Sequence, residues 1–181
     1  MLCGIDEAGR GPIAGPLVIA GAMLPNPIEG LADSKKLTEK RRELLFEKIS
    51  ESAIFHIVSF SALEVDEMGI SACIKSALES IKTHMDTTDF LFDGNTTFGV
   101  SGLKTLVKAD NQIEEVKAAS ILAKVTHDRT MNEAAKVFPE YGFDSHKGYG
   151  TKAHVEAITK YGYCTLHRRT FKLKALEATL L

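Results

Sequence analysis

Paired cysteines and long apolar runs are missing from this chain of 181 residues. Its three cysteines are an odd number at scattered positions without a C-x-x-C pair, which argues against a disulfide framework or a zinc site and favours a reducing cytoplasm. No apolar run approaches the roughly 20 residues of a membrane span. Asp6, Glu7 and Arg10 also interrupt the N-terminal stretch in which a signal peptide would need its apolar region. We therefore expect a cytoplasmic enzyme without membrane contact.

The usual glycine motifs for nucleotide phosphates are absent as well. The segment Gly9-Arg10-Gly11 has neither the G-x-G-x-x-G spacing of a dinucleotide-binding loop nor the GK[ST] ending of a P-loop. Glycine and proline gather instead between residues 9 and 16, one residue after two acids. Glycine adopts backbone conformations forbidden to other residues and proline stiffens the path, so this loop can bring its backbone close to a ligand. We expect a sugar-phosphate edge there, with backbone groups able to sense a 2′-hydroxyl.

Charge is spread unevenly along the chain, although its net value is only −2. Residues 141–181 contain seven Lys or Arg against three acids, a balance of +4 that leaves −6 for the first 140 residues. A basic end beside an acidic body fits a polyanion that is held partly by cations and partly through metal ions. An ordinary solvated charged face is the alternative.

Apolar patterns predict strands that alternate with helices. Residues 2–6 and 17–24 are nearly continuous apolar runs, which indicates strands buried on both faces. Thr38, and Ser61 with Glu64, are typical helix caps. This order favours an α/β domain with a mixed sheet and helices on both faces. We also predict strands over 53–60, 90–92 and, buried, 103–107; helices over 39–50, from 61 through an apolar stripe ending at 81, 113–137 and 152–161; and a loop over 141–150.

Four acids stand at the ends of predicted strands: Asp6, Glu7, Asp93 and Asp110. Open α/β sheets place their sites at the carboxyl ends of strands, so these carboxylates can meet at one edge of the sheet. Clustered carboxylates repel one another without cations, and an all-oxygen ligand set selects Mg²⁺ or Mn²⁺ over zinc. Two such ions about 4 Å apart can activate a water and stabilise the leaving oxygen of a phosphodiester. Taken singly, an acid at a strand end is more often a turn or helix cap than a ligand.

Asp6 and Glu7 pose a geometric problem, since neighbours in a regular strand point to opposite faces of the sheet. For both side chains to face one site, the strand must bend or end there. Gly9 and Gly11 supply the backbone freedom for such a bend.

Tyr149 lies between two glycines and is poorly placed to be a core residue. We expect it to stack on a sugar or a base, with an ordinary surface tyrosine as the alternative. His146 and His167 lie in the same basic region and are candidates for phosphate contact, whereas His56 in an apolar strand is interpreted as structural.

Six blocks of sequence stand out together along the chain. The blocks are DEAGRGP at 6–12, DSKKL at 33–37, FDG at 92–94, AASILAKV at 118–125 followed by Asp128-Arg129, HKGYGT at 146–151 and HRR at 167–169. In this order they resemble the ribonuclease HII family, the type 2 ribonucleases H. The resemblance implies a ribonuclease H-like mixed β-sheet flanked by helices. It also implies a catalytic domain over residues 1–140 and a small basic, mostly helical C-terminal region over residues 141–181 that packs on it.

The resemblance also implies which residues form the site. Many bacterial members have glycine before the fourth acid, whereas this chain has Ala109, followed by Asn111, which puts the geometry of Asp110 in question. The family's catalytic, metal-binding carboxylates fall on Asp6, Glu7, Asp93 and Asp110. Its substrate-binding glycine-arginine-glycine loop falls on Gly9, Arg10 and Gly11, and its tyrosine falls on Tyr149. We expect three cations from the matching blocks to bind substrate as well: Lys36, Lys147 and Arg168.

The implied activity is endonucleolytic cleavage of RNA in RNA/DNA hybrids and 5′ of a ribonucleotide embedded in duplex DNA, leaving 3′-hydroxyl and 5′-phosphate ends. Asp6 and Asp93 would hold two divalent ions most directly, with Glu7 and Asp110 completing the two sites. We expect a monomer whose partners are these nucleic acids. Three alternatives stay open: a catalytically inactive hybrid-binding module, a nuclease of the same fold that cuts only DNA, and ribonuclease HIII, which usually has an extra N-terminal domain and a glutamate as fourth acid.

Overall fold

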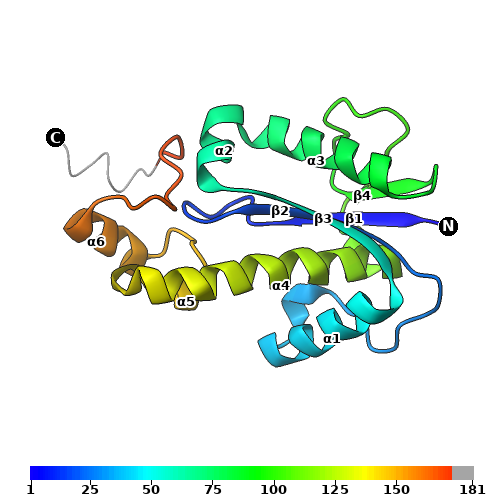
Figure 1. Ribbon diagram of the computed structural model, residues 1–181, viewed down its shortest axis with the longest axis horizontal. Helices are drawn as coiled ribbons and strands as arrows, with labels where there is room; N and C mark the ends of the chain where they lie inside the picture. Colours follow the sequence, from blue (N-terminus) through cyan, green and yellow to red (C-terminus); the bar gives the residue numbers. More distant parts are fainter. Residues whose placement is uncertain (173–181) are drawn as a thin grey trace.

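A five-stranded sheet with the order β3-β2-β1-β4-β5 forms the centre of the computed structural model, which describes residues 1–172 (Figure 1). The β1-β2 and β2-β3 pairs are antiparallel, whereas β1-β4 and β4-β5 are parallel. The expected mixed sheet of an α/β fold is therefore confirmed. The strands are β1 (Cys3–Ala8), β2 (Leu17–Met23), β3 (Ile54–Phe60), β4 (Phe90–Asp93) and β5 (Lys104–Leu106).

Helices cover both faces of this sheet, as Figure 1 shows. Helices α2 (Ala62–Met68) and α3 (Ile70–His84) lie on one face, and α1 (Glu39–Ser52) and α4 (Glu114–Val137) lie on the other. Strand β2 serves both cores, because its alternate residues point to opposite faces. Leu17 and Ile19 belong to the core under α3, and Val18 and Ala20 belong to the core under α4. This double burial is the reason for the continuous apolar run in the sequence.

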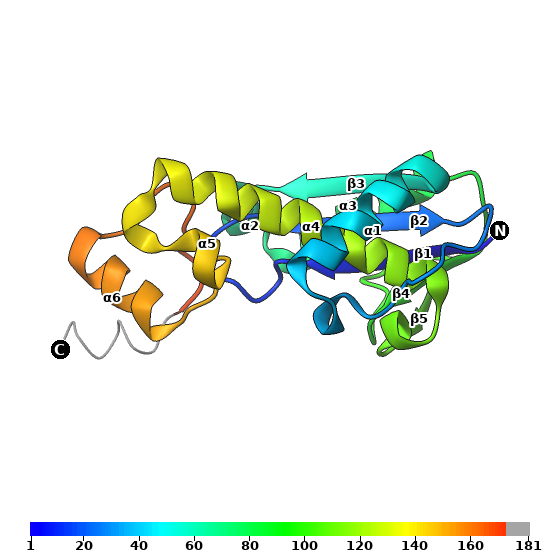
Figure 2. The same cartoon turned by 90° about the horizontal axis from the view of Figure 1, so that it is seen from below.

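Helix α4 lies close against the sheet because small residues meet where the two approach. A Cβ at Gly4 of β1 would stand 2.4 Å from the Val116 nitrogen, so only glycine fits there. Ala118, Ala119 and Ala123 are fully buried on the same side. The second half of α4 runs past the end of the sheet and carries the C-terminal region (Figure 2).

Local capping chemistry sets several helix starts. The Thr38 hydroxyl accepts from the Arg41 N–H at the start of α1, and Ser61 and Glu64 form the predicted capping box of α2. The single helix predicted after Ser61 is wrong in one respect: Gly69, with φ of 82°, ends α2 and begins α3. The predicted burial of the strand near residue 103 is also wrong, because β5 is an edge strand with Lys104 and Leu106 exposed.

The described part of the C-terminal region, residues 141–172, packs on the end of α4 around a third apolar core, and the rest of the predicted region lies outside the described residues. It includes α5 (Phe143–His146), a short helix within the predicted loop, and α6 (Lys152–Tyr161). Buried Phe143 and Ile158 share this core with Ile13 and Ala14 from the N-terminal loop and with Met131 from α4. The loop after β1 is thus held between the sheet and this region. Within residues 1–172, no helix combines the length and apolarity needed to cross a membrane.

Candidate active site

Three of the predicted acids form one cluster. Asp6, Asp93 and Asp110 each offer a carboxylate oxygen within 4.8 Å of the others. Asp6 lies on β1 and Asp93 ends β4, and these two strands are parallel neighbours, so their carboxyl ends lie at the same edge of the sheet. Asp110 comes from the turn η2 (Ala109–Asn111), which follows β5. Sheet topology thus brings Asp6 to two carboxylates that lie more than 80 residues later in the sequence.

The turn that carries Asp110 is wrapped around Asp93. The Lys108 N–H donates to Asp93 Oδ1 at 2.9 Å, and the Asp110 N–H donates to Asp93 Oδ2 at 3.1 Å. Lys108 adopts a left-handed conformation with φ of 58°, which turns both amides toward the carboxylate. Ala109, at the position that put the geometry of Asp110 in question, is fully buried, and Asp110 still reaches the cluster.

Charge within the cluster is poorly compensated. Burial, followed by repulsion from Glu7 and Asp93, raises the pKa of Asp6 well above its ordinary value. Burial also raises the pKa of Asp110, although Lys35, whose Nζ lies 3.5 Å from Asp110 Oδ2, opposes this. Packed carboxylates of this kind favour a bound cation, and their oxygen atoms suit a hard divalent ion such as Mg²⁺ or Mn²⁺. The residues present therefore fit the metal that their chemistry implies.

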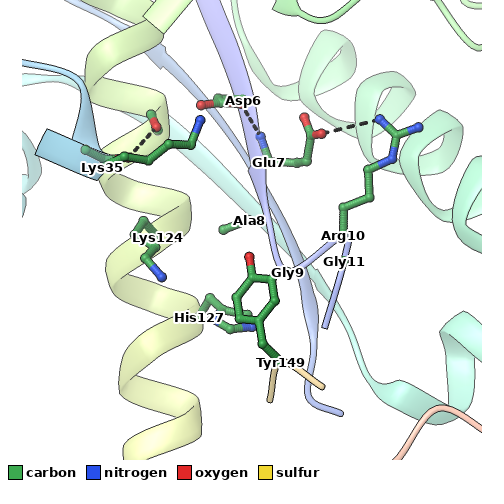
Figure 3. Close-up of a pocket in the computed structure, with 12 residues that line it drawn as sticks. Asp6, Glu7, Ala8, Gly9, Arg10, Gly11, Lys35, Lys124, His127 and Tyr149 are labelled. Carbon is green, nitrogen blue, oxygen red and sulfur yellow. Dashed lines mark hydrogen bonds and ion pairs between the residues drawn. The ribbon is translucent and has the colours of Figure 1, made fainter. Parts of the chain in front are cut away.

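Glu7 stands apart from this cluster. Strand β1 pairs regularly with β2 through Asp6, Glu7 and Ala8, so the predicted bend at Asp6-Glu7 is wrong. Asp6 turns toward α4 and Lys35, whereas Glu7 turns toward Arg10, whose Nη1 lies 3.5 Å from Glu7 Oε1 (Figure 3). The other carboxylate oxygen of Glu7, Oε2, is buried without a hydrogen-bond partner among the described residues.

Both acids nevertheless line the same cavity, of about 340 Å³. The pairing of β1 with β4 ends at Ile5 and Phe92, which leaves the edge of β1 uncovered at the next residues. Burial raises the pKa of Glu7 as well, against the opposing charge of Arg10. An uncovered strand edge lets side chains from both faces reach one cavity, and a bend is not required.

The cavity has further lining residues that the sequence analysis did not single out. They include Ser120, Lys124 and His127, which are spaced along α4 so that they share one helix face. That spacing was a readable signal. Ser34 and Lys35, from the short helix η1 (Ser34–Lys36), complete this wall.

The loop after β1 forms the opposite wall and requires glycine at position 9. Gly9 has φ of 83°, and a Cβ there would stand 2.2 Å from the Pro16 carbonyl oxygen and 2.6 Å from the His127 ring. A Cβ on Gly11 would lie 3.6 Å from the Tyr149 ring, an ordinary contact. Tyr149 itself is 47% exposed at the mouth of the cavity, which agrees with its predicted place outside the core.

The predicted substrate contact of Arg168 is wrong, because this residue is buried and cannot reach a substrate directly. Its side chain is only 1% exposed, and its guanidinium donates to five backbone carbonyls of the loop. The acceptors are Gly9 at 2.6 Å, Pro16 at 2.8 Å, Pro12 and Gly15 at 3.0 Å and Arg10 at 3.3 Å.

This arrangement orients the loop. The carbonyl and the N–H of a trans peptide point in opposite directions. Since the carbonyls of Gly9 and Arg10 point to Arg168, the N–H groups of Arg10 and Gly11 point away from it. Arg168 therefore holds the loop from behind and leaves two backbone donors free of that contact.

The remaining predicted cations and histidines lie outside the cavity lining. Lys36 bonds Asn111 at 2.7 Å, beside the Asp110 turn, and its side chain is largely exposed. Lys147 is mostly buried and bonds Asn132. His146 and His167 belong to a cluster of histidines behind Tyr149, so the expected phosphate contact does not fit their positions.

Comparison with known proteins agrees with this site. The Ribonuclease HII family model matches residues 3–174. A ribonuclease HII of Sulfurovum sp. (strain NBC37-1) is 61% identical over 180 residues, which covers 99% of this chain and 96% of that protein. Among solved structures, the ribonuclease HII in the PCNA complex of Archaeoglobus fulgidus superposes with a TM-score of 0.84 at 27% identity, covering 96% of both chains.

A second solved structure, the ribonuclease H2 of Pyrococcus horikoshii OT3, gives a TM-score of 0.76 at 29% identity and covers 94% of this chain and 93% of the other. These matches confirm the ribonuclease H-like fold and favour ribonuclease HII over its sibling ribonuclease HIII. The chain belongs to the ribonuclease HII family, whose members are metal-dependent endoribonucleases acting on RNA/DNA hybrids.

Proposed function

We propose that this ribonuclease cleaves 5′ of ribonucleotides, including single ones embedded in duplex DNA, with two divalent ions and release of 3′-hydroxyl and 5′-phosphate ends. One observation carries the proposal: Asp6 and Glu7 line the same cavity as the Gly9-Arg10-Gly11 loop, and Asp6 belongs to the acid cluster. A scissile phosphate at the acids would therefore place the adjacent ribose against the loop. The cut would then depend on the sugar beside it.

The acids are the proposed metal ligands. Asp6 and Asp93 would hold the ions most directly, Asp110 adds an oxygen from the same cluster, and Glu7 approaches from the other side of β1. Bound divalent ions would supply a water nucleophile and stabilise charge on the leaving oxygen. Mg²⁺ and Mn²⁺ both suit these oxygen ligands, and parallel assays with each ion would rank them.

The other cavity residues would select and place the substrate. The N–H groups of Arg10 and Gly11, which point away from Arg168, would donate to the 2′-hydroxyl. The half-exposed ring of Tyr149 would pack on the sugar. Lys35 and Lys124 line the cavity on the acid side and would attract the phosphate.

The test uses a DNA duplex with one ribonucleotide and maps the cut position in Mg²⁺. Asp6→Asn and Asp93→Asn should each abolish cleavage, whereas Asp86→Asn, a matched change at an exposed acid, should leave it intact. Full activity of either cluster variant would overturn the metal assignment. An all-deoxy duplex separates this function from that of a DNA-only nuclease, because it should stay uncut.

A further inference from the structure

Three histidines surround the backbone of Tyr149. His154 is fully buried, and its Nδ1 lies 2.9 Å from the Tyr149 carbonyl oxygen. His146 stacks on His154 with ring centroids 4.2 Å apart, and its Nδ1 accepts from the Gly148 N–H at 3.2 Å. His167, also buried, places Nε2 3.0 Å from Nε2 of His154. The phosphate contact expected of His146 and His167 is thus replaced by a set of internal contacts.

The hydrogen bonds among these rings run in one direction. The Cys164 N–H donates to His167 Nδ1 at 2.9 Å, so His167 accepts at Nδ1 and carries its proton on Nε2. His167 Nε2–H then donates to Nε2 of His154. His154 consequently carries its proton on Nδ1, which donates to the Tyr149 carbonyl. Each neutral ring has one possible tautomer in this chain of bonds.

Burial supports the neutral state of both rings. It lowers the pKa of His154 to about 4 and that of His167 to about 4. Neighbouring charge acts in the same direction, since Arg169 lowers the pKa of His167 and His146 lowers both. At neutral pH the chain of bonds from Cys164 to Tyr149 is therefore complete.

Tyr149 needs such support because of where it lies. Its ring is about half exposed and its neighbours are Gly148 and Gly150, which give the backbone great freedom. Gly148 has φ of 85°, and a Cβ there would stand 2.2 Å from the Ala14 carbonyl oxygen. The Tyr149 carbonyl accepts from the Thr151 N–H at 2.8 Å as well as from His154. These two donors fix the peptide plane that follows Tyr149.

We propose that His154, held by His167, is a positioning residue that fixes Tyr149 in the orientation needed to bind the sugar beside the cut. The proposal rests on the substrate-binding role of Tyr149 stated above. A flexible loop between glycines would otherwise lose conformational entropy when the substrate binds. The histidines would remove that cost before binding, so their effect should appear in KM and leave kcat nearly unchanged.

Two variants at one position isolate the bond to Tyr149. His154→Asn keeps an amide donor near the place of Nδ1, whereas His154→Gln moves the amide toward Nε2 and loses that donor. Both variants lose the ring that packs on His146 and Phe143. On a duplex with one ribonucleotide, we expect His154→Gln to raise KM about tenfold and His154→Asn about twofold. His84→Gln, at an exposed helix end, is the matched control.

A double-mutant cycle with Tyr149→Ala separates positioning from general structural damage. If His154 acts through Tyr149, His154→Gln should add nothing to the KM of Tyr149→Ala. An equal further rise in that background would overturn the proposal. If Tyr149→Ala raises KM and His154→Gln does not, the role of Tyr149 stands and that of His154 fails. An unchanged KM for Tyr149→Ala would refute the role of Tyr149 and the positioning role together.

A spectroscopic measurement tests the chain of bonds without any variant. The ¹⁵N shifts of the imidazole rings at neutral pH should show a proton on Nδ1 of His154 and on Nε2 of His167. The opposite tautomer at His154 would overturn the proposal even if the variants failed to fold.

Discussion

The acid cluster and the C-terminal region both contribute side chains to one cavity, but they differ in how their buried polar groups are compensated. The buried carboxylates of the cluster lack sufficient positive charge, whereas the buried polar groups of the C-terminal region have hydrogen-bond partners. In the cluster, buried Asp6 and Asp110 lie close to Asp93, and the ion pair from Lys35 is long, with a lysine side chain that is 79% exposed. In the C-terminal region, the guanidinium of Arg168 has five acceptors. His154 has a partner at each ring nitrogen.

This difference separates chemistry from recognition. The cluster stays electrostatically unfavourable until cations arrive, which is the state expected of a catalytic centre that must bind metal. Arg168 and His154, behind the loop that would contact the substrate, already have their hydrogen-bond partners before any substrate binds, so this part of the site is preorganised. Changes to the first region should therefore affect catalysis more than stability, and changes behind the loop should reduce stability.

The largest effect is expected for Asp6→Asn. Cleavage should fall by at least about a thousandfold, equivalent to roughly 4 kcal/mol of transition-state stabilisation. Without metal, the same change should raise the free energy of unfolding by about 1 kcal/mol, because a buried carboxylate with a raised pKa is replaced by a neutral amide. Cleavage assays and urea unfolding of one preparation measure both. A loss of stability would contradict the contrast between the regions.

Arg168→Met should show the reverse balance. Five carbonyl acceptors would lose their donor, and four of them accept at 3.0 Å or less in buried surroundings. We therefore expect the free energy of unfolding to fall by about 3 to 5 kcal/mol. Denaturant unfolding measures this loss. The neighbouring Arg169 has an exposed side chain, so Arg169→Met should change stability by less than about 0.5 kcal/mol. Equal losses for the two variants would show that the burial of Arg168 is unimportant.

Lowering the pH should change the free energy of unfolding in opposite directions through the two regions. His154 and His167 have folded pKa values of about 4, below the ordinary value, so the unfolded chain binds more protons between pH 6.5 and 4. Their contribution should lower the free energy of unfolding by about 3 kcal/mol between pH 6.5 and 4.5.

The acids act oppositely over this range. The raised pKa values of Asp6, Glu7 and Asp110 mean that the native state binds more protons than the unfolded chain, so their protonation stabilises the fold as pH falls. Unfolding curves of His154→Asn should depend less on pH than those of the parent protein, and those of Asp6→Asn should fall more steeply with acid. Parallel curves for all three proteins would contradict both assignments.

The smallest effect is thermal stabilisation by metal. A divalent ion at a hundredfold excess over its Kd should add about 2.7 kcal/mol, because it binds the folded cluster and not the unfolded chain. Melting curves with and without Mg²⁺ should show this shift for the parent protein and for Asp86→Asn. Asp93→Asn should show little or none. A shift retained in Asp93→Asn would place the metal elsewhere.

Several features could be predicted because their cause is local. Thr38, and Ser61 with Glu64, cap helices through bonds that span only three residues. The apolar run of β2 indicated burial on both faces, which the structure confirms. The acids could be predicted because both strand ends and carboxylates can be recognised in a sequence. Asp6, Asp93 and Asp110 do form a cluster.

Other features depended on contacts between distant segments. The predicted bend at Glu7 was unnecessary, because the pairing of β1 with β4 stops at Ile5 and leaves the edge of β1 open at the next residues. Lys104 and Leu106 were predicted to lie in a buried strand, but their strand is at the edge of the sheet and both residues are exposed. Neither strand order nor strand length is encoded by the residues immediately around these positions.

By itself, the sequence determined the alternation of strands and helices, the family and the positions of the acids, since each follows from residue type and short-range spacing. Only the tertiary structure decided what Arg168 and the histidines do. An arginine in a basic segment resembles a phosphate ligand until carbonyls some 150 residues earlier in the chain surround it. Likewise, His154 and His167 became neutral internal groups behind Tyr149 because burial beside the core around Phe143 excludes water from them. Burial set the roles of these side chains, and burial is a property of the whole fold.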